Sequence, residues 1–161
     1  MDNKNSQIIR MDEHILYFDC HSNVLLCKSI ESGKKLWIKK VDDPGFLNGV
    51  IEDSSRFFIA FESGEKNGIF ITVNKNDGLT LWDIPGRAFL YRVFQDFIYL
   101  IFIDESENYF FIKVDILKGT IVWHHKVAKD LCEYIINPSG IVLQYLSGKV
   151  EKIDIETGAM I

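Results

Sequence analysis

The sequence of 161 residues predicts an all-β protein made of four repeat units, each with four short antiparallel strands. Three observations predict this fold class. A short motif recurs at a spacing near that of one supersecondary unit, short apolar runs have the composition of strands, and no stretch shows helical periodicity.

The repeated motif is a glycine followed four residues later by a tryptophan. The segments "SIESGKKLW", "NKNDGLTLW" and "DILKGTIVW" align without gaps on Gly33, Gly78 and Gly119, and together they use all three tryptophans. A fourth copy, "DIETGAMI", places Gly158 correctly and stops at Ile161, one residue before a tryptophan would be due. The glycines are therefore 45, 41 and 39 residues apart. Self-similarity at such a period indicates a repeat architecture.

Each copy of the motif is typical of a turn between two strands. The residue four positions before the glycine is Ser29, Asn74, Asp115 or Asp154. Its short polar side chain can accept a hydrogen bond from the backbone two residues on, and glycine adopts the positive φ that a tight turn requires. The tryptophan in the next strand supplies a large apolar body, so we expect it to pack between neighbouring units.

Further strand-like runs precede each turn. Unit two, for example, has "FLNGVIE", then "RFFIAFE", then "GIFITVN", and unit three begins with "AFLYRVF". Four strands in about 40 residues are typical of a propeller blade. The sequence thus predicts a small β-propeller or propeller-like array of four four-stranded antiparallel blades. We expect a single domain, 1–161, with repeat units at approximately 6–41, 42–85, 86–127 and 128–161.

The sequence does not determine whether this array closes into a ring. Four units can form a small ring, an open curved array, half of an eight-bladed ring completed by a second copy, or the first part of a longer chain. The N-terminal run "SQIIRMDE" is either the first strand of unit one or a strand that completes unit four.

The pattern of Asp, two residues, Thr, Gly, three residues and Trp resembles the repeat of the PQQ-like, or quinoprotein-like, β-propellers. The segment "DIETG" is its cleanest match, whereas Ser29 and Asn74 depart from Asp, and Ser32, Asp77 and Lys118 depart from Thr. The resemblance implies a fold and not an activity. Quinoprotein enzymes with this repeat also carry adjacent cysteines and cofactor-stacking residues in long loops, and this chain has neither, so we expect no cofactor.

Composition agrees with a folded domain and limits the classes of partner. Hydrophobic residues make up 47% of the chain and aromatic residues 13%, which is ample for a core at this length. The net charge of −5 and a pI near 5.3 argue against nucleic acid as the primary ligand and mildly favour a basic partner. The run "FIYLIFI" is far shorter than a membrane span, and the N-terminus is polar, so we expect a cytoplasmic protein that does not insert into membranes.

No catalytic or metal-binding pattern is present in the sequence. Cys20, Cys27 and Cys132 lack the spacing of metal ligands, and we interpret them as free thiols of a reducing compartment. His124 and His125 are adjacent on a strand and therefore point to opposite faces, which disfavours a shared metal. The segment "GEKNG" is a polar hairpin and not a phosphate-binding loop. We expect a protein that is not an enzyme, with no catalytic, cofactor or metal site.

Acidic turns give the one candidate binding surface. In a four-stranded blade, the turn between the second and third strands shares one face with the connector between blades. The turns "ESGEKNG" and "DESEN" and the connector after unit one supply carboxylates and one aromatic ring to this face. A negative patch of this kind can steer a cationic protein into place. The predicted partner-binding residues are Asp42, Asp43, Glu62, Glu65, Asp104, Glu105, Glu107 and Tyr109.

Two functional hypotheses follow from these observations. The first is a non-enzymatic protein-binding module, and its sharpest form is a small acidic cytoplasmic inhibitor or immunity protein that neutralises a basic toxin such as a nuclease. This protein would be a monomer or a homodimer. The alternative is a fragment or subunit of a larger quinoprotein-like propeller that acts as an enzyme or an assembly scaffold.

Overall fold

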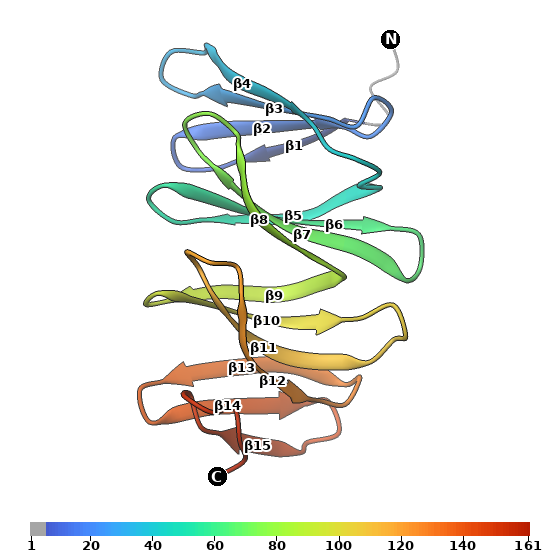
Figure 1. Cartoon of the computed structure of the whole chain (residues 1–161), viewed down its shortest axis with the longest axis vertical. Coiled ribbons are helices and arrows are strands. Elements are labelled where there is room, and N and C mark those ends of the chain that lie inside the picture. Colours follow the sequence, from blue (N-terminus) through green and yellow to red (C-terminus); the bar gives the residue numbers. More distant parts are fainter. Residues whose placement is uncertain (1–5) are drawn as a thin grey trace. The chain divides into compact units, whose positions relative to one another are not determined.

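The computed structural model describes residues 6–161, and within that range the chain consists of β-strands, turns and connectors, with no helix. Fifteen strands form four antiparallel sheets, which we call blades 1 to 4 (Figure 1). The chain divides into two compact units, unit 1 up to Arg87 and unit 2 from Ala88 to Ile161. The all-β fold in four antiparallel repeats is therefore confirmed.

Unit 1 holds two complete blades, and each is a meander in which consecutive strands pair. Blade 1 consists of β1 (Ser6–Arg10), β2 (His14–Asp19), β3 (Val24–Ser29) and β4 (Lys35–Lys40). Blade 2 consists of β5 (Phe46–Glu52), β6 (Arg56–Ser63), β7 (Asn67–Asn74) and β8 (Thr80–Pro85). Because β1 pairs with β2, the N-terminal run is the first strand of blade 1.

Unit 2 holds one complete blade and one blade with three strands. Blade 3 consists of β9 (Arg87–Phe94), β10 (Phe97–Ile103), β11 (Tyr109–Asp115) and β12 (Ile121–Lys126). Blade 4 consists of β13 (Leu131–Asn137), β14 (Gly140–Tyr145) and β15 (Val150–Ile153). Among the described residues, what corresponds to a fourth strand is one bridge between Ile153 and Met160. The expectation of four strands thus holds for three of the four sheets.

The four motif turns share one hydrogen-bond pattern. In each, the glycine amide donates to the carbonyl oxygen four residues earlier, as from Gly158 to Asp154 at 2.8 Å. The polar side chain at that earlier position accepts from the following amides, and Asp154 Oδ1 accepts from both Glu156 and Thr157. All four glycines have φ between 67° and 73°, the left-handed region that glycine adopts without strain. The predicted turn chemistry is confirmed.

The tryptophan of one blade lies on the glycine turn of the next blade within each unit. Trp37 of blade 1 donates from Nε1 to the Lys75 carbonyl oxygen at 2.7 Å, and Trp123 of blade 3 donates to the Ile155 carbonyl oxygen at 3.1 Å. A Cβ added to Gly78 would lie 2.5 Å from the Trp37 ring, and one added to Gly158 would lie 2.6 Å from the Trp123 ring. The indole of one blade and the glycine turn of the next thus form a contact between neighbouring sheets, which we call the lock. Glycine is required in this turn because it adopts positive φ and because a Cβ would collide with the indole.

The third tryptophan occupies the same register in its own sheet. Trp82 pairs with Thr72, as Trp37 pairs with Cys27 and Trp123 with Lys113. Its side chain is buried, with 8% exposure, and packs against Phe58 and Phe70.

The core of each unit lies between its two blades. In unit 1 the alternate side chains of blade 1 that include Leu16, Leu25 and Trp37 meet those of blade 2 that include Phe57 and Ile59. In unit 2 the packing is more aromatic and contains the following residues: Tyr99, Phe111, Trp123, Tyr134, Leu143 and Ile153. These alternations are the period-2 pattern of a strand with one face buried.

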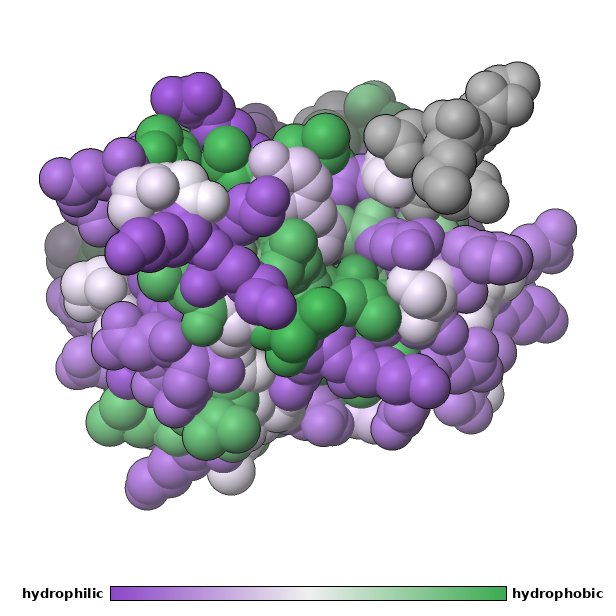
Figure 2. Space-filling view, turned by 90° about the horizontal axis from the view of Figure 1, so that it is seen from above, coloured by the Kyte–Doolittle hydropathy of each residue, from purple (hydrophilic) through white to green (hydrophobic). Residues whose placement is uncertain are grey.

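Blade 1 has a second, more open face. Ile8 and Ile38 are exposed there, and Lys28 lies over the ring of Tyr17 at 5.3 Å from its centroid. Figure 2, which looks onto blade 1, shows green apolar side chains gathered near the middle of the view with polar side chains around them. Blade 1 therefore has one packed face and one open face.

Candidate functional site

The predicted acidic residues of unit 1 lie at one end of its strands. The connector that carries Asp42 and Asp43 leads into β5, whose first residue, Phe46, pairs with Glu62 of β6. The connector passes so close to β6 that a Cβ added to Gly45 would collide with the Glu62 carbonyl oxygen. The turn that follows Glu62 carries Glu65. These carboxylates are therefore brought to the same end of unit 1.

The predicted acidic residues of unit 2 lie on the hairpin between β10 and β11. Asp104 Oδ1 accepts hydrogen bonds from the amides of Ser106 and Asn108, each at 2.9 Å. The bond from the Asn108 amide, with further bonds from its side chain and from Ser106, lowers the pKa of the Asp104 carboxyl below its usual 3.8. Glu107 adopts φ of 61° in this tight hairpin. Asp104 thus shapes the loop, whereas Glu105 and Glu107 are exposed.

A basic side chain and the next connector flank this hairpin. The charge of Lys126, at the end of β12, also contributes to the low pKa of Asp104. Tyr109 begins β11, and its carbonyl oxygen accepts from the Val127 amide at 2.9 Å, so the connector to blade 4 lies beside the hairpin. The hairpin and the connector share one end of unit 2, as the strand order requires. That the acidic hairpins of the two units share a single face stays a prediction.

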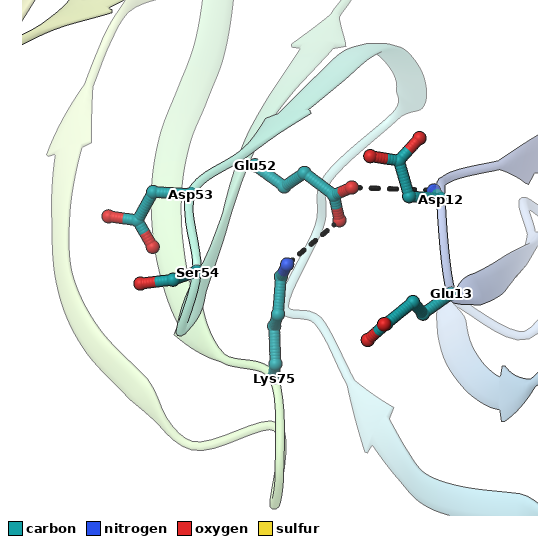
Figure 3. Close-up of a pocket in the computed structure, with 6 residues that line it drawn as sticks. All are labelled: Asp12, Glu13, Glu52, Asp53, Ser54 and Lys75. Atoms are coloured by element: carbon teal, nitrogen blue, oxygen red, sulfur yellow. Dashed lines mark hydrogen bonds and ion pairs between the residues drawn. The ribbon is translucent and has the colours of Figure 1, made fainter.

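A pocket at the other end of unit 1 has a lining that sequence analysis did not single out. It has a volume of about 430 Å³. Its lining comes from three turns, between β1 and β2, between β5 and β6, and between β7 and β8 (Figure 3). The lining residues are Asp12, Glu13, Glu52, Asp53, Ser54 and Lys75. Four carboxylates and one lysine therefore line the pocket.

An ion pair joins the two blades within this pocket. Lys75 Nζ lies 3.0 Å from Glu52 Oε2, and both side chains are mostly buried. The Asp12 amide points at Glu52 Oε1 from 3.4 Å, a long hydrogen bond. The Lys75 backbone is held by the Trp37 indole and by the Ser55 carbonyl oxygen, and its ammonium lies 5.3 Å from the centroid of Phe57. The lock between the blades thus also fixes the pocket lysine.

The remaining carboxylates of the pocket differ in their partners. Asp53 pairs with Arg56 at 2.7 Å. Burial raises the pKa of Asp53, but the hydrogen bonds from Ser55 and Arg56 outweigh burial and keep this pKa below its usual 3.8. Asp12 and Glu13 have no side-chain hydrogen bond or ion pair within residues 6–161, and Glu13 points into the space beside Lys75 (Figure 3). The pocket therefore offers two uncompensated carboxylates.

The sequence contained a signal for this pocket. The first turn of blade 1 reads "MDEH" and the first turn of blade 2 reads "EDSS", so each of these two turns carries an acidic pair, although the two pairs are offset by two positions. Equivalent turns of neighbouring blades lie at the same end of the sheets. Aligning the first turns as well as the motif turns would have brought these carboxylates together.

The cysteines and the paired histidines have separate surroundings. Burial raises the pKa of the Cys27 thiol to about 11, while Cys20 is half-buried and Cys132 is exposed. His124 contacts the ring of Phe110, and His125 Nε2 lies 3.6 Å from Glu151 Oε2 of blade 4.

In residues 6–161, no group of three or more His, Cys, Asp or Glu side chains is arranged to hold a metal ion. The same described range contains no helix long and apolar enough to cross a membrane.

The chain is similar to known proteins in structure. No protein-family model and no curated protein matches the chain. BamB from Moraxella catarrhalis has a TM-score of 0.60 at 19% identity, over 99% of this chain and 47% of BamB. The computationally designed Ika4 protein has a TM-score of 0.66 at 10% identity, over 94% of this chain and 93% of Ika4. The quinohemoprotein alcohol dehydrogenase of Comamonas testosteroni has a TM-score of 0.62 at 10% identity, over 96% of this chain and 34% of the dehydrogenase.

These likenesses show the fold, because all three identities are low. The chain spans about half the length of the BamB structure and about a third of the alcohol dehydrogenase. The structures that it matches include enzymes as well as designed proteins, so the fold alone assigns no activity. With the Asp-to-Trp repeat, the four antiparallel sheets and these neighbours together, the chain has the fold of the PQQ-like β-propellers.

Proposed function

We propose that the chain is a non-enzymatic protein-binding module and that it binds a basic protein through its carboxylates. The pocket of unit 1 carries this proposal. Within residues 6–161, two of its carboxylates, Asp12 and Glu13, have no side-chain ion pair, while Lys75 pairs with Glu52. A lysine or arginine side chain of a partner would offset part of this negative charge.

The size and charge of the pocket suit a single long cationic side chain. A volume of about 430 Å³ has room for an arginine or lysine together with ordered water. Counting Arg56 with the lining residues, four carboxylates face two cations, so the local charge is −2. An arginine is favoured because its guanidinium can donate two parallel hydrogen bonds to one carboxylate.

The acidic hairpins have a different role in this proposal. Glu65 in unit 1 and Glu105 and Glu107 in unit 2 are exposed on hairpin ends, where solvent screens each charge, and half-buried Glu62 lies near Glu65 at the end of β6. Exposed charges of this kind mainly change the rate at which partners meet. We expect them to steer the basic partner, with Asp42, Asp43 and Tyr109 at the edges of the same loops.

The most concrete form of the proposal is a cytoplasmic inhibitor or immunity protein that covers a basic toxin such as a nuclease. The acidic pocket and hairpins fit a toxin whose own substrate is an anion, because that toxin must present cations. Co-expression tests this form. If a toxin gene lies beside this one, cells that produce that toxin should survive with the wild-type chain and die with a variant that carries Asp12→Asn and Glu13→Gln; death with the wild-type chain as well would contradict this form of the proposal.

Binding kinetics with the recovered partner test the general proposal. The pocket variant Asp12→Asn/Glu13→Gln should mainly speed dissociation, because it removes charges that contact the partner. The hairpin variant Glu105→Gln/Glu107→Gln should mainly slow association, and more so at low salt. Asp104 is left in place because it forms the loop. Identical kinetics for the wild type and both variants at two salt concentrations would remove the carboxylates from the mechanism.

A second candidate function is favoured by the lengths of the matched structures. The chain covers 47% of BamB and 34% of the alcohol dehydrogenase, so it corresponds in size to part of such a propeller. In that case it would be a fragment or subunit of a larger quinoprotein-like propeller, as an enzyme or an assembly scaffold. Sequencing the natural reading frame downstream tests this, since a tryptophan codon directly after Ile161 would complete the fourth motif.

A further inference from the structure

We propose that an apolar pocket on blade 3 binds an aromatic side chain that is flanked by basic residues in the partner. This inference rests on the proposed function for the basic partner, and it adds an apolar contact to the charged ones. The pocket has a volume of about 190 Å³, and all of its lining comes from blade 3. The lining residues are Phe102, Asp104, Phe110, Ile112, Ile121 and His124.

The strand register places the inner part of this lining on one face of the sheet. Phe102 of β10 pairs with Phe110 of β11, and Ile112 of β11 pairs with His124 of β12. Directly paired residues point to the same face of a sheet, and residues two apart along a strand repeat that face. Because Phe110 and Ile112 are two residues apart, both pairs lie on one face.

A β-bulge supplies the outer wall of the pocket. The register of β12 against β11 shifts at Val122, which has no partner there. Ile121 and His124 are three residues apart, so in a regular strand they would point to opposite faces. The extra residue in the bulge lets Ile121 pair with Val114 and share the face of Ile112. Ile121 remains 43% exposed, so a partner can reach this wall.

The bulge recurs in three blades, but the apolar wall does not. The fourth strands of blades 1, 2 and 3 show the same register shift before their tryptophan. The position two residues after the motif glycine is Ile121 in blade 3, and it is Lys35 and Thr80 in blades 1 and 2. In blade 2 the position of His124 is occupied by Asp83. The bulge therefore belongs to the repeat, whereas the apolar wall is particular to blade 3.

The size and the walls of the pocket suit one aromatic ring. An apolar cavity of about 150 Å³ can hold benzene, and this pocket is somewhat larger, at about 190 Å³. His124 already lies edge-on to Phe110, with ring centroids 5.3 Å apart. Aromatic rings favour such edge-to-face contacts, so a ring from the partner would pack against Phe102 and Phe110. A buried ring of this kind is a typical anchor of a protein interface.

The acidic hairpin beside the pocket specifies the neighbours of that ring. Asp104 lines the pocket and begins the turn that carries Glu105 and Glu107. The Asp104 carboxylate already accepts hydrogen bonds from the amides of Ser106 and Asn108. Glu105 and Glu107 are exposed, and neither forms an ion pair within residues 6–161. Basic residues next to the ring would therefore meet these two carboxylates.

Short synthetic peptides test the inference with the whole chain. The probe is the tripeptide Arg-Phe-Arg with both ends blocked. Its controls are Arg-Ala-Arg, which lacks the ring, and Glu-Phe-Glu, which reverses the charges. Methyl NMR follows Ile112 and Ile121 during each titration. We expect Arg-Phe-Arg to shift both methyl signals and each control to bind at least about tenfold more weakly, because one loses the buried ring and the other is repelled by the hairpin.

A matched pair of variants locates the binding site. Ile121→Thr gives the pocket wall the residue that blade 2 has at this position, and it should weaken the binding of Arg-Phe-Arg several-fold. Val122→Thr makes a similar change at the neighbouring residue, which does not line the pocket, and it should leave binding unchanged.

Three outcomes would overturn the inference: equal binding of Arg-Phe-Arg and Arg-Ala-Arg, equal losses in the two variants, or no shift at either isoleucine. Each of them leaves the proposed function standing, because the Asp12→Asn/Glu13→Gln variant tests that proposal separately. Conversely, unchanged partner binding by that variant would remove the acidic pocket from the mechanism and leave the peptide result intact.

Discussion

The contact between blades 1 and 2 and the contact between blades 3 and 4 use the same lock with different neighbours. In both, an indole lies on a glycine turn and donates to the carbonyl oxygen three residues before that glycine. Beside the indole, however, blade 1 has the buried thiol of Cys27, whereas blade 3 has the ammonium of Lys113. Lys113 Nζ donates to the same Ile155 carbonyl oxygen at 2.9 Å and lies 4.1 Å from the centroid of Phe97.

A lysine side chain therefore lies at both contacts, but the two lysines belong to different elements. In unit 2 it extends from strand β11 and is buried, with Glu156 at 3.7 Å. In unit 1 it extends from the turn of blade 2, as Lys75, and reaches Glu52 in the acidic pocket. The motif positions therefore fix the lock, while the residues around it determine whether the contact is filled by a buried side chain or borders a pocket.

The largest expected effect comes from removing the indole from each lock. Trp37→Ala and Trp123→Ala should each lower the free energy of unfolding by about 3–5 kcal/mol, because each leaves a cavity between two sheets. Urea denaturation measures both. A loss below about 1 kcal/mol at either site would mean that the lock does not hold its two blades together.

The glycines beneath the indoles allow a matched comparison. Gly33 and Gly78 have nearly the same φ, 67° and 73°, but an added Cβ meets nothing within 4 Å at Gly33 and the Trp37 ring at Gly78. Gly33→Ala should therefore cost about 1–2 kcal/mol from backbone strain alone. Gly78→Ala should cost roughly 1–3 kcal/mol more from overpacking. Equal losses by thermal unfolding would contradict the clash.

Substitution of the buried lysine of unit 2 tests whether its charge stabilises the contact between blades 3 and 4. Lys113→Met should change the free energy of unfolding by less than about 1.5 kcal/mol, because methionine fills a similar volume and removes a buried charge. The Ile155 carbonyl oxygen would still accept from Trp123. Denaturant titration of Lys113→Met beside Lys113→Ala checks this, since only the alanine variant leaves a cavity. A large loss in both would show that the ammonium itself is required.

The contact in unit 2 should also depend on pH through Glu151. Burial raises the pKa of this carboxyl, but hydrogen bonds from Lys149 and Tyr145 outweigh burial and hold it below 4.5. A depressed folded-state pKa gives stability that is present above pH 4.5 and lost as the pH falls through the folded-state value. Glu151→Gln should therefore destabilise the chain more at pH 7 than at pH 3. Parallel pH profiles for the two proteins would argue against this role.

The smallest expected effect is at the acidic hairpin of unit 2. Glu105→Gln/Glu107→Gln should change the free energy of unfolding by less than about 0.5 kcal/mol, because both side chains are exposed. Asp104→Ala should cost more, since it removes the acceptor of two backbone amides. Thermal unfolding of the two variants compares them directly. A hairpin variant as unstable as Asp104→Ala would mean that it cannot be used to test binding.

Sequence reasoning predicted the repeat and its turns because these depend on local chemistry. Gly78 must adopt positive φ, and the residue at Asn74 must accept backbone hydrogen bonds, whatever the rest of the chain does. The acidic pocket was not predicted, because it forms where turns 40 residues apart meet across two blades.

The central claim is that carboxylates of this chain bind a basic protein. Affinity capture from a lysate of the source cell tests it most directly, with the wild-type chain and the Asp12→Asn/Glu13→Gln variant as parallel baits and quantitative mass spectrometry as the readout. The account predicts that one basic protein is enriched on the wild type and is several-fold lower on the variant. Equal enrichment on both baits, or enrichment of an acidic protein, would contradict it.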